Sequence, residues 1–415
     1  MLNYIYMPEL NSQQQFDDVI KNYLDKQASV SSDSQPELEI KFGTKGVKSI
    51  SLIDFNNVIK KLKSSKFIQE SDMYSLKIAS QFRDKESGRT KESNVRTEIN
   101  GFASVQKYCK NNILSDDLRP EFLQKYSYKD SKGEWINGVF IKDYNINVKL
   151  QEEKTFSSNN SFGKKIISDW KDVKKTFRYL NRISFIHSEL PVRIDMSIVK
   201  ESNKEEIEFR GRKQLKLKPE YTIEASNVFN NPEKYEIEIE VLNRKVGVAT
   251  EYNDVSKISS MLKKIIKYVL SGLQNTNYPI SYTNMESIGK QYLKTINGKE
   301  YDEKRMRMYS KFFPGPGSVT LQNINIAPIN NEANIPNIRE NYTVTDKADG
   351  LRKLLFINNK GNIYLIDTNM NIQFTGAMTK NIDLFDTILD GEHILHNKKG
   401  EFINLFASFD IYIIN

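Results

Sequence analysis

Two stretches of this sequence alternate charged and apolar residues with a period of two, although they lie far apart in the chain. The first reads PELEIKF over residues 36–42, and the second reads YEIEIEV over residues 235–241. Successive side chains of a strand point to opposite faces, so each stretch predicts a strand with one apolar and one acidic face. One such face alone is ordinary on a half-solvated sheet. Two of them constrain the fold, because carboxylates brought close together repel each other unless a cation lies between them.

Strand-like segments between these two stretches carry the opposite charge. The clearest cover residues 93–99, 145–153, 177–186 and 192–199, and turn-like segments separate them. Their basic residues are Arg96, Lys149, Arg178, Arg182 and Arg193. Many short strands with one charged and one apolar face predict a closed barrel that is polar inside and covered outside by helices. The alternative is a set of solvated sheet faces.

Other parts of the chain show helical or irregular patterns. Helical periodicity predicts helices at residues 14–25, 51–63 and 254–270, and Ser51 and Asp54 form an S-x-x-D start signal for the second. Residues 201–232 are charged, and we expect a loop with some helix there. Residues 273–340 are rich in Asn and Pro and indicate a linker, whereas residues 341–415 alternate short strands and turns. We therefore divide the chain into a barrel domain (1–245), a helix and linker (246–340) and a second domain (341–415).

Composition narrows the class of protein. The 415 residues include 61 Lys and Arg against 53 Asp and Glu, which favours a polyanionic partner. A single cysteine excludes an internal disulfide and fits a reducing compartment. No apolar run is long enough for a membrane span, so we expect a soluble, intracellular protein without a membrane partner. With only three histidines, a zinc site is disfavoured, and carboxylates suit Mg²⁺ or Mn²⁺.

The segments ELEIK and YEIEIE, with basic strands between them, resemble the metal-dependent RNA triphosphatases of the triphosphate tunnel metalloenzyme superfamily. The resemblance implies an α+β fold in which an eight-stranded antiparallel tunnel with flanking helices holds a divalent metal. It also implies removal of the γ-phosphate from 5′-triphosphate RNA, with no DNA partner. The metal ligands would be Glu37, Glu39, Glu238 and Glu240. The phosphate-binding residues would be Lys41, Arg96, Lys149, Arg182 and Arg193. Carboxylates that orient cations or water would be Glu153, Asp195 and Glu236.

A second motif lies near the end of the sequence. The segment YTVTDKADGLR contains Lys347, Asp349, Gly350 and Arg352 in a K-x-D-G-x-R pattern, and ILDGEHI and FASFDIY follow it. These segments resemble motifs of the covalent nucleotidyltransferases, which include mRNA guanylyltransferases and ATP-dependent ligases. The resemblance implies that Lys347, in its neutral form, attacks the α-phosphate of GTP. Arg352 would contact the ribose, and Glu392 the ribose or a metal.

A tunnel triphosphatase followed by a guanylyltransferase is the order found in mRNA capping enzymes of poxvirus-like, asfarvirus-like and giant viruses. That resemblance implies a place in the host cytoplasm or the virion. The later guanylyltransferase motifs, the OB-fold domain and the methyltransferase domain of those enzymes are absent from this sequence. We therefore expect the chain to stop inside the nucleotidyltransferase core and to form little lysine–GMP by itself.

Three other functions stay open from the sequence. One is an ATP-dependent polynucleotide ligase, which shares the K-x-D-G-x-R pattern. Another is a tunnel enzyme that acts on inorganic or thiamine triphosphate. The third is a basic RNA-binding subunit without catalytic activity. The sequence does not indicate whether a partner subunit is needed.

Overall fold

The computed structural model describes residues 10–27, 34–43, 49–83, 88, 90–130, 133–209, 211–315, 320–329, 335–344 and 347–414. The chain divides into two units, Met1–Asn275 and Thr276–Asn415, and each is described by itself. Within the described residues, no helix combines the length and the apolar character that a membrane crossing requires.

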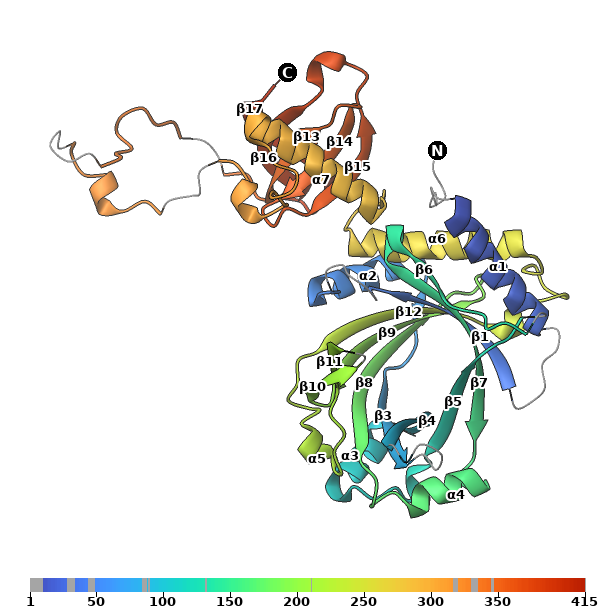
Figure 1. The fold of residues 1–415 in the computed structure, drawn as a ribbon. Helices are drawn as coiled ribbons and strands as arrows, with labels where there is room; N and C mark the ends of the chain where they lie inside the picture. Colours follow the sequence, from blue (N-terminus) through green and yellow to red (C-terminus); the bar gives the residue numbers. More distant parts are fainter. Residues whose placement is uncertain are drawn as a thin grey trace. The chain divides into compact units, whose positions relative to one another are not determined.

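A closed antiparallel barrel of eight strands forms the centre of the first unit (Figure 1). The order around the barrel is β1–β12–β9–β8–β3–β4–β5–β7, and the pairing of β7 with β1 closes it. The strands are β1 (Ser34–Phe42), β3 (Met73–Arg83), β4 (Thr90–Asn100), β5 (Glu121–Ser127), β7 (Ile146–Phe156), β8 (Lys175–Ile186), β9 (Val192–Glu201) and β12 (Lys234–Val241). The predicted α+β fold with an eight-stranded antiparallel barrel is confirmed.

The apolar core of the first unit lies outside the barrel. Helices α1 (Leu10–Gln27), α2 (Leu52–Ser64) and α6 (Val255–Leu273) lie together over one side of it (Figure 1). One apolar cluster joins these helices to the outward faces of β1, β7, β9 and β12. A second cluster joins α3 (Phe102–Asn111) to the outward faces of β3 and β4. Because successive strand residues alternate between faces, the polar residues of these strands point into the barrel.

Local sequence signals fix the helices that cover the barrel. Ser51 and Asp54 form a reciprocal capping box at the start of α2, as the S-x-x-D pattern predicts. Asp254 caps α6 by accepting a hydrogen bond from the backbone N–H of Lys257. A Cβ on Gly272 of α6 would lie 2.5 Å from the Cα of Val58 in α2. The glycine therefore allows the two helices to touch backbone to backbone.

Smaller elements extend the barrel. Strand β2 (Ile68–Gln69) pairs with β8, and β6 (Val139–Ile141) pairs with β7 next to the end of β5. Residues 201–232, expected as a loop with some helix, instead contain a β-hairpin. It is formed by β10 (Lys204–Phe209) and β11 (Arg212–Leu217), and the short helix α5 (Ile223–Ser226) follows. Helix α4 (Ser161–Ser168) connects β7 to β8.

The second unit is an antiparallel sheet packed against a helix. The sheet order is β15 (Ile372–Met378), β14 (Asn362–Asp367), β13 (Leu351–Ile357), β16 (Thr387–His396) and β17 (Phe402–Ile413). Helix α7 (Tyr282–Asn297) buries Ile288, Tyr292 and Leu293 in one apolar cluster with the sheet. Residues 273–340 were expected to be a linker, so α7 corrects that expectation. The sequence assigned residues 246–340 to a helix and a linker. The helix of that segment, α6, packs on the barrel and belongs to the first unit.

Candidate active site

The two acidic stretches lie side by side in the barrel. Strands β1 and β12 pair so that Glu39 lies opposite Glu240 and Lys41 lies opposite Glu238. Residues paired directly across an antiparallel ladder share a face, so all four side chains point to the same side of the sheet. Their apolar neighbours Leu38, Ile40, Ile237 and Ile239 are buried in the cluster outside the barrel, which places the carboxylates inside.

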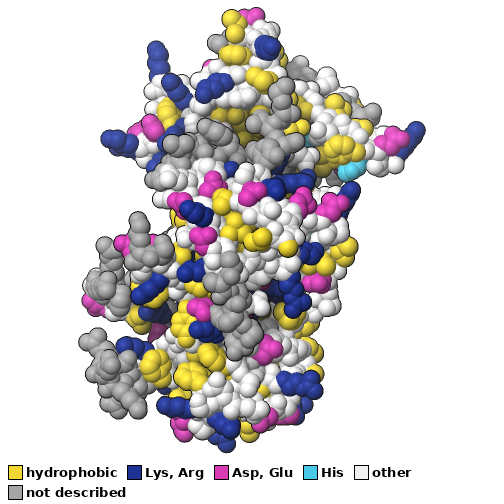
Figure 2. Space-filling model, turned by 90° about the vertical axis from the view of Figure 1, so that its right-hand side faces the viewer, with side chains coloured by type: hydrophobic (Ala, Val, Ile, Leu, Met, Phe, Trp, Pro, Cys, Tyr) yellow, Lys and Arg dark blue, Asp and Glu magenta, His cyan; other side chains and the backbone are white. Residues whose placement is uncertain are grey.

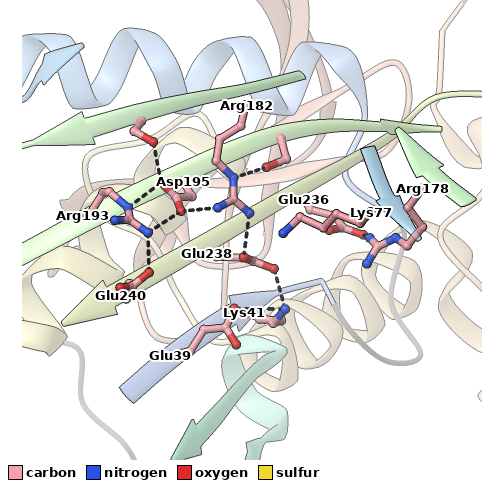
Figure 3. A network of polar contacts seen from close by, with 12 residues as sticks. Glu39, Lys41, Lys77, Arg178, Arg182, Arg193, Asp195, Glu236, Glu238 and Glu240 are labelled. Atoms are coloured by element: carbon pink, nitrogen blue, oxygen red, sulfur yellow. Dashed lines mark hydrogen bonds and ion pairs between the residues drawn. The ribbon is translucent and has the colours of Figure 1, made fainter. Parts of the chain in front are cut away.

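The ammonium of Lys41 lies between two carboxylates. It is 3.0 Å from Glu39 and 2.5 Å from Glu238 (Figure 3). Burial and the neighbouring charge of Glu238 raise the pKa of Glu39 to about 7. Burial would also raise the pKa of Glu238, but the charges of Lys41 and Arg182 outweigh it and lower that pKa. The pKa values of the two carboxylates are thus shifted in opposite directions, although the ammonium of Lys41 contacts both.

Asp195 of β9 connects two arginines on the neighbouring wall. It accepts hydrogen bonds from Arg182 at 2.8 Å, from Arg193 at 3.0 Å and from the hydroxyl of Ser184 at 2.7 Å (Figure 3). Arg193 also contacts Glu240 at 2.5 Å, and Arg182 lies 3.6 Å from Glu238. Both arginines thus point into the barrel, as the alternation in their strands predicted. Burial alone would lower the pKa of Arg193, but the attraction of Asp195 and Glu240 outweighs it and raises that pKa.

The opposite wall carries further cations. Lys77 of β3 lies 3.3 Å from Glu98 of β4, and Arg96 pairs with the same carboxylate. Burial lowers the pKa of Lys77 to about 8, although Glu98 acts in the other direction. The Nε of Arg96 is buried without a hydrogen-bond partner among the described residues. This wall therefore holds a donor that the protein's own described groups leave unused.

Strands β5 and β7 complete the ring of charge. Lys125 pairs with Glu37 and lies 3.3 Å from Glu153. Lys149 lies directly opposite Glu39 in the pairing of β7 with β1, so it shares the inner face. Every residue that the sequence assigned to the tunnel therefore faces the barrel interior or lies along its rim. Near the end of the barrel where β8 begins, Arg178 contacts Glu236 at 2.6 Å.

The carboxylate set fits a hard divalent cation in its chemistry. All four proposed ligands offer only oxygen, and the pair Glu39 and Glu238 already encloses a positive charge, the ammonium of Lys41. Among the described residues, no three Asp, Glu, His or Cys side chains are grouped closely enough to hold a metal ion. Glu37 and Glu240 are paired with Lys125 and Arg193 instead. Metal binding therefore requires these side chains to exchange a basic partner for the metal.

Several interior residues were missed as site residues by sequence reasoning. They are Lys77, Glu98, Lys125 and Ser184, and Arg178 was noted only as a basic strand residue. A signal was present for Lys77, because Leu76 and Ile78 flank it in an alternating run. Lys125 gave no comparable signal, because EFLQKYS does not alternate: the apolar Leu123 shares the face of Lys125, and the polar Gln124 lies on the other face.

The nucleotidyltransferase-like motif of the second unit lies at the start of β13. Lys347 and Asp349 are exposed and precede the strand, whereas Thr345 and Asp346 lie outside the described residues. The backbone N–H of Gly350 donates a hydrogen bond to Glu392 at 3.2 Å, so the first motif contacts the D-G-E segment. A Cβ on Gly350 would lie 2.6 Å from the carbonyl oxygen of His393, which explains the glycine.

Arg352 is bound by the protein itself. Its guanidinium makes two hydrogen bonds to the buried Asp390, at 3.2 and 2.6 Å, and its Nη2 lies 3.4 Å from the hydroxyl of Tyr412. The ring of Phe313 lies against it, with the guanidinium carbon 5.5 Å from the ring centre. The resemblance implied a ribose contact for Arg352. In the structure its guanidinium joins β13 to β16 and β17, and the ribose contact stays a prediction.

Comparison with known proteins gives matches for both parts of the chain. Residues 260–415 match the family described as mRNA capping enzyme, catalytic domain. A probable mRNA-capping enzyme of Acanthamoeba polyphaga mimivirus is 26% identical over 180 residues, which are 43% of this chain and 12% of that relative. The chain thus spans about an eighth of the length of this curated relative.

Two solved structures of low similarity also match. A mimivirus capping enzyme triphosphatase is 15% identical, with 64% of this chain and 99% of that chain covered and a TM-score of 0.38. The S. pombe Pct1 RNA triphosphatase is 12% identical, with 58% and 81% covered and a TM-score of 0.29. The closed eight-stranded barrel is established by the strand pairing within this chain.

Proposed function

We propose that the barrel of the first unit hydrolyses the γ-phosphate of 5′-triphosphate RNA with the help of Mg²⁺ or Mn²⁺. The observation that carries the proposal is the pairing of two acidic strands, β1 and β12, inside a closed barrel whose other strands supply cations. A protein that needed only stability would fill a barrel interior with apolar side chains, because buried ion pairs contribute little to stability. A polyphosphate with a divalent metal matches this mixture of charges.

The metal would be held by Glu37, Glu39, Glu238 and Glu240, and when bound it would neutralise charge on the transferring phosphoryl group. Lys41, which contacts Glu39 and Glu238 in the structure, would be placed to contact a phosphate oxygen when these carboxylates hold the metal.

The remaining cations would grip the triphosphate. Arg182 and Arg193 are oriented by Asp195, Lys125 and Lys149 lie near β1, and Arg96 holds an unused donor. Fixed donors around a phosphoryl group supply positioning and charge stabilisation, which dominate the catalysis of phosphoryl transfer. Glu153 and Glu236 pair with Lys125 and Arg178 and would orient these cations or the attacking water.

A guanylyltransferase role is proposed for the second unit. It is supported by the match of residues 260–415 to the capping-enzyme catalytic domain and by the contact between Gly350 and Glu392. Lys347 would form the bond to GMP, with Asp349, Gly350 and Glu392 near the nucleotide. Arg352 would support the same site through Asp390, whether or not it reaches the ribose.

The triphosphatase is tested by incubating the purified chain with γ-labelled 5′-triphosphate RNA and Mg²⁺ or Mn²⁺. Release of labelled phosphate that requires the metal, and that Glu39→Gln abolishes, supports the proposal. A matched control is Lys213→Ala, because Lys213 is exposed on the β10–β11 hairpin. Inorganic tripolyphosphate and thiamine triphosphate are run in parallel. If either compound is hydrolysed but no γ-phosphate is released from RNA, the barrel is a small-molecule triphosphatase instead.

A further inference from the structure

Two helices on the outside of the barrel carry several lysines and little acidic charge, since Asp54 in its first turn is the one acidic residue of α2 and α6 has none. Residues 55–67, which include most of α2, contain four lysines and no Asp or Glu, and the same holds for residues 255–273 of α6. The chain as a whole mixes the two signs, with 61 basic and 53 acidic residues. On the face drawn in Figure 2, Lys and Arg lie interspersed with Asp and Glu. The composition of α2 and α6 therefore departs from that of the chain as a whole.

Helix packing gathers part of this charge on one side. The contact between Gly272 and Val58 aligns the two helices, and Lys61 of α2 then lies near Lys267 of α6. Burial, followed by the charge of Lys267, lowers the pKa of Lys61. On the other side of α6, Lys263 lies near Asp17 of α1, so the charge there is balanced.

The lysines also approach one end of the barrel. His187 follows the last residue of β8, and its ring packs on Phe67 with ring centres 5.1 Å apart. Burial first, and then the charges of Lys264, Lys66 and Lys245, lower the pKa of His187, while Glu189 opposes them. The name lysine patch is used below for Lys61, Lys66, Lys264 and Lys267.

Strand register identifies the end of the barrel beside the lysine patch. Ile186 pairs with Arg193, and Val241 pairs with Val192, so β8 and β12 finish where β9 begins. Lys66 and Lys264 act on His187, which directly follows β8, and Lys245 lies shortly after β12. The patch is therefore outside the barrel, beside the opening at which β8 and β12 finish. The β10–β11 hairpin follows the other end of β9 and marks the opposite opening.

The chemistry of the patch fits a phosphate backbone. Lysine is a compact point charge that binds phosphate without reading base sequence, and a run of such charges binds nucleic acid by releasing counterions. Lys66 and Lys264 are exposed and able to meet a ligand in solvent. A γ-phosphate inside the barrel is connected to a chain of further phosphates that must leave through one opening, and only one opening adjoins the patch.

We propose that the lysine patch binds the backbone of the RNA whose 5′ end occupies the barrel, so that the RNA leaves through the opening where β8 and β12 finish. This inference rests on the proposed triphosphatase function, and it adds the path of the RNA and a class of contact that a free triphosphate lacks. The patch lets the enzyme favour RNA ends over small triphosphates.

The test compares two substrates in two double variants. Lys66→Ala/Lys264→Ala removes two exposed charges of the patch, and Lys213→Ala/Lys218→Ala removes two exposed charges of the hairpin at the opposite opening. The substrates are a single-stranded 5′-triphosphate RNA of about 20 nucleotides, which exceeds the ~4–16 nucleotides of a typical single-strand site, and inorganic tripolyphosphate. The patch variant is expected to raise KM for RNA and to leave KM for tripolyphosphate unchanged. Its plot of log affinity against log salt should be about 1.4 shallower, at about 0.7 per lost phosphate contact.

The outcomes separate this inference from the function on which it rests. If the hairpin variant raises KM for RNA and the patch variant does not, the RNA leaves by the other opening and the inference is wrong. Equal effects on RNA and tripolyphosphate also overturn it, because the patch would then act on the barrel itself. If the wild-type chain hydrolyses neither substrate, the triphosphatase proposal fails. Binding of 5′-hydroxyl RNA to the same variants then still tests whether the lysine patch binds the RNA backbone. If the patch variant binds RNA as tightly as the wild-type chain, the proposed RNA path is refuted. The ligand of the lysine patch would then be an acidic protein instead of RNA.

Discussion

Replacing Asp195 by asparagine tests whether the two interior arginines depend on one buried carboxylate. Asp195 is only 2% exposed and accepts hydrogen bonds from Arg182, Arg193 and Ser184. Removing one partner of a buried ion pair costs about 3–5 kcal/mol, because the other charge is left uncompensated. Arg182 is 15% exposed and Arg193 is 32% exposed, and each keeps a second carboxylate nearby. We therefore expect a loss at the lower end, about 3 kcal/mol of unfolding free energy, mostly through Arg182.

The measurement is urea denaturation of Asp195→Asn, Arg182→Gln and the double variant, with a parallel set for Arg193→Gln. Residues in direct contact show coupling energies of about 0.5–3 kcal/mol, and the coupling of Asp195 with Arg182 should exceed that with Arg193. Ser184→Ala is the matched control, because it removes one neutral hydrogen bond, worth about 1 kcal/mol, from the same carboxylate.

The same variants also lose catalysis for a separate reason. A misplacement of a catalytic group by 1 Å costs about a hundredfold in rate, so kcat/KM of Asp195→Asn should fall by a factor of that order. A Glu-to-Gln change at an exposed site away from the barrel interior should change neither the free energy of unfolding nor kcat/KM. If Asp195→Asn unfolds within about 1 kcal/mol of wild type and keeps its activity, the carboxylate does not hold the arginines and the reasoning is wrong.

Three further predictions concern the metal, the opposite wall and the second unit. Glu39→Ala and Glu240→Ala should each reduce triphosphatase activity at least about a hundredfold. A bound metal stabilises the transition state by several kcal/mol, and each ~1.36 kcal/mol corresponds to a tenfold change in rate. Activity within a few-fold of wild type would contradict the ligand assignment. Because the pKa of Lys77 is lowered to about 8, its ammonium loses charge above that pH, and KM for the triphosphate should rise between pH 8 and 9. Lys77→Arg should flatten this rise, and an unchanged profile in that variant assigns the pH dependence elsewhere. With α-labelled GTP, an extended version that also carries the later guanylyltransferase motifs should be labelled far more strongly than this chain. Label that survives Lys347→Ala in the extended version, or that comes from ATP alone, rejects the guanylyltransferase assignment.

The acidic strands were predictable because their signal is local. An alternation with period two needs no knowledge of partners, so β1 and β12 and the inward direction of Glu39 and Glu240 follow from the sequence. Pairing is a different matter, because hydrogen bonds between strands depend on residues far apart in the chain. The sequence therefore could not place Lys41 between Glu39 and Glu238, although it named all three residues.

The two errors in the fold have a common physical cause. Residues 204–217 are charged on both faces, which is typical of a loop, yet backbone pairing across a hairpin forms without an apolar face. Helix α7 lies in a segment rich in Asn, and only four of its residues are buried. Its stability comes from packing Tyr292 against Phe356 of the sheet. A contact between residues so far apart in the chain cannot be predicted from a local sequence pattern.

Charged groups inside the barrel lower the stability of the free protein, and we interpret them as required for function. The two apolar clusters outside the barrel bury large side chains from five helices and connections, and they are sufficient to define the fold. The interior contributes ion pairs such as that of Lys77 with Glu98, whose burial shifts the lysine pKa downward, which is the direction expected of an unfavourable environment for charge. The charge of Lys77, which its surroundings disfavour, would be stabilised by a ligand of opposite sign, so under the proposed function a polyphosphate would gain binding energy from this group. Under the proposed function, the wall that holds Lys77 would therefore be more stable with a bound triphosphate than without one.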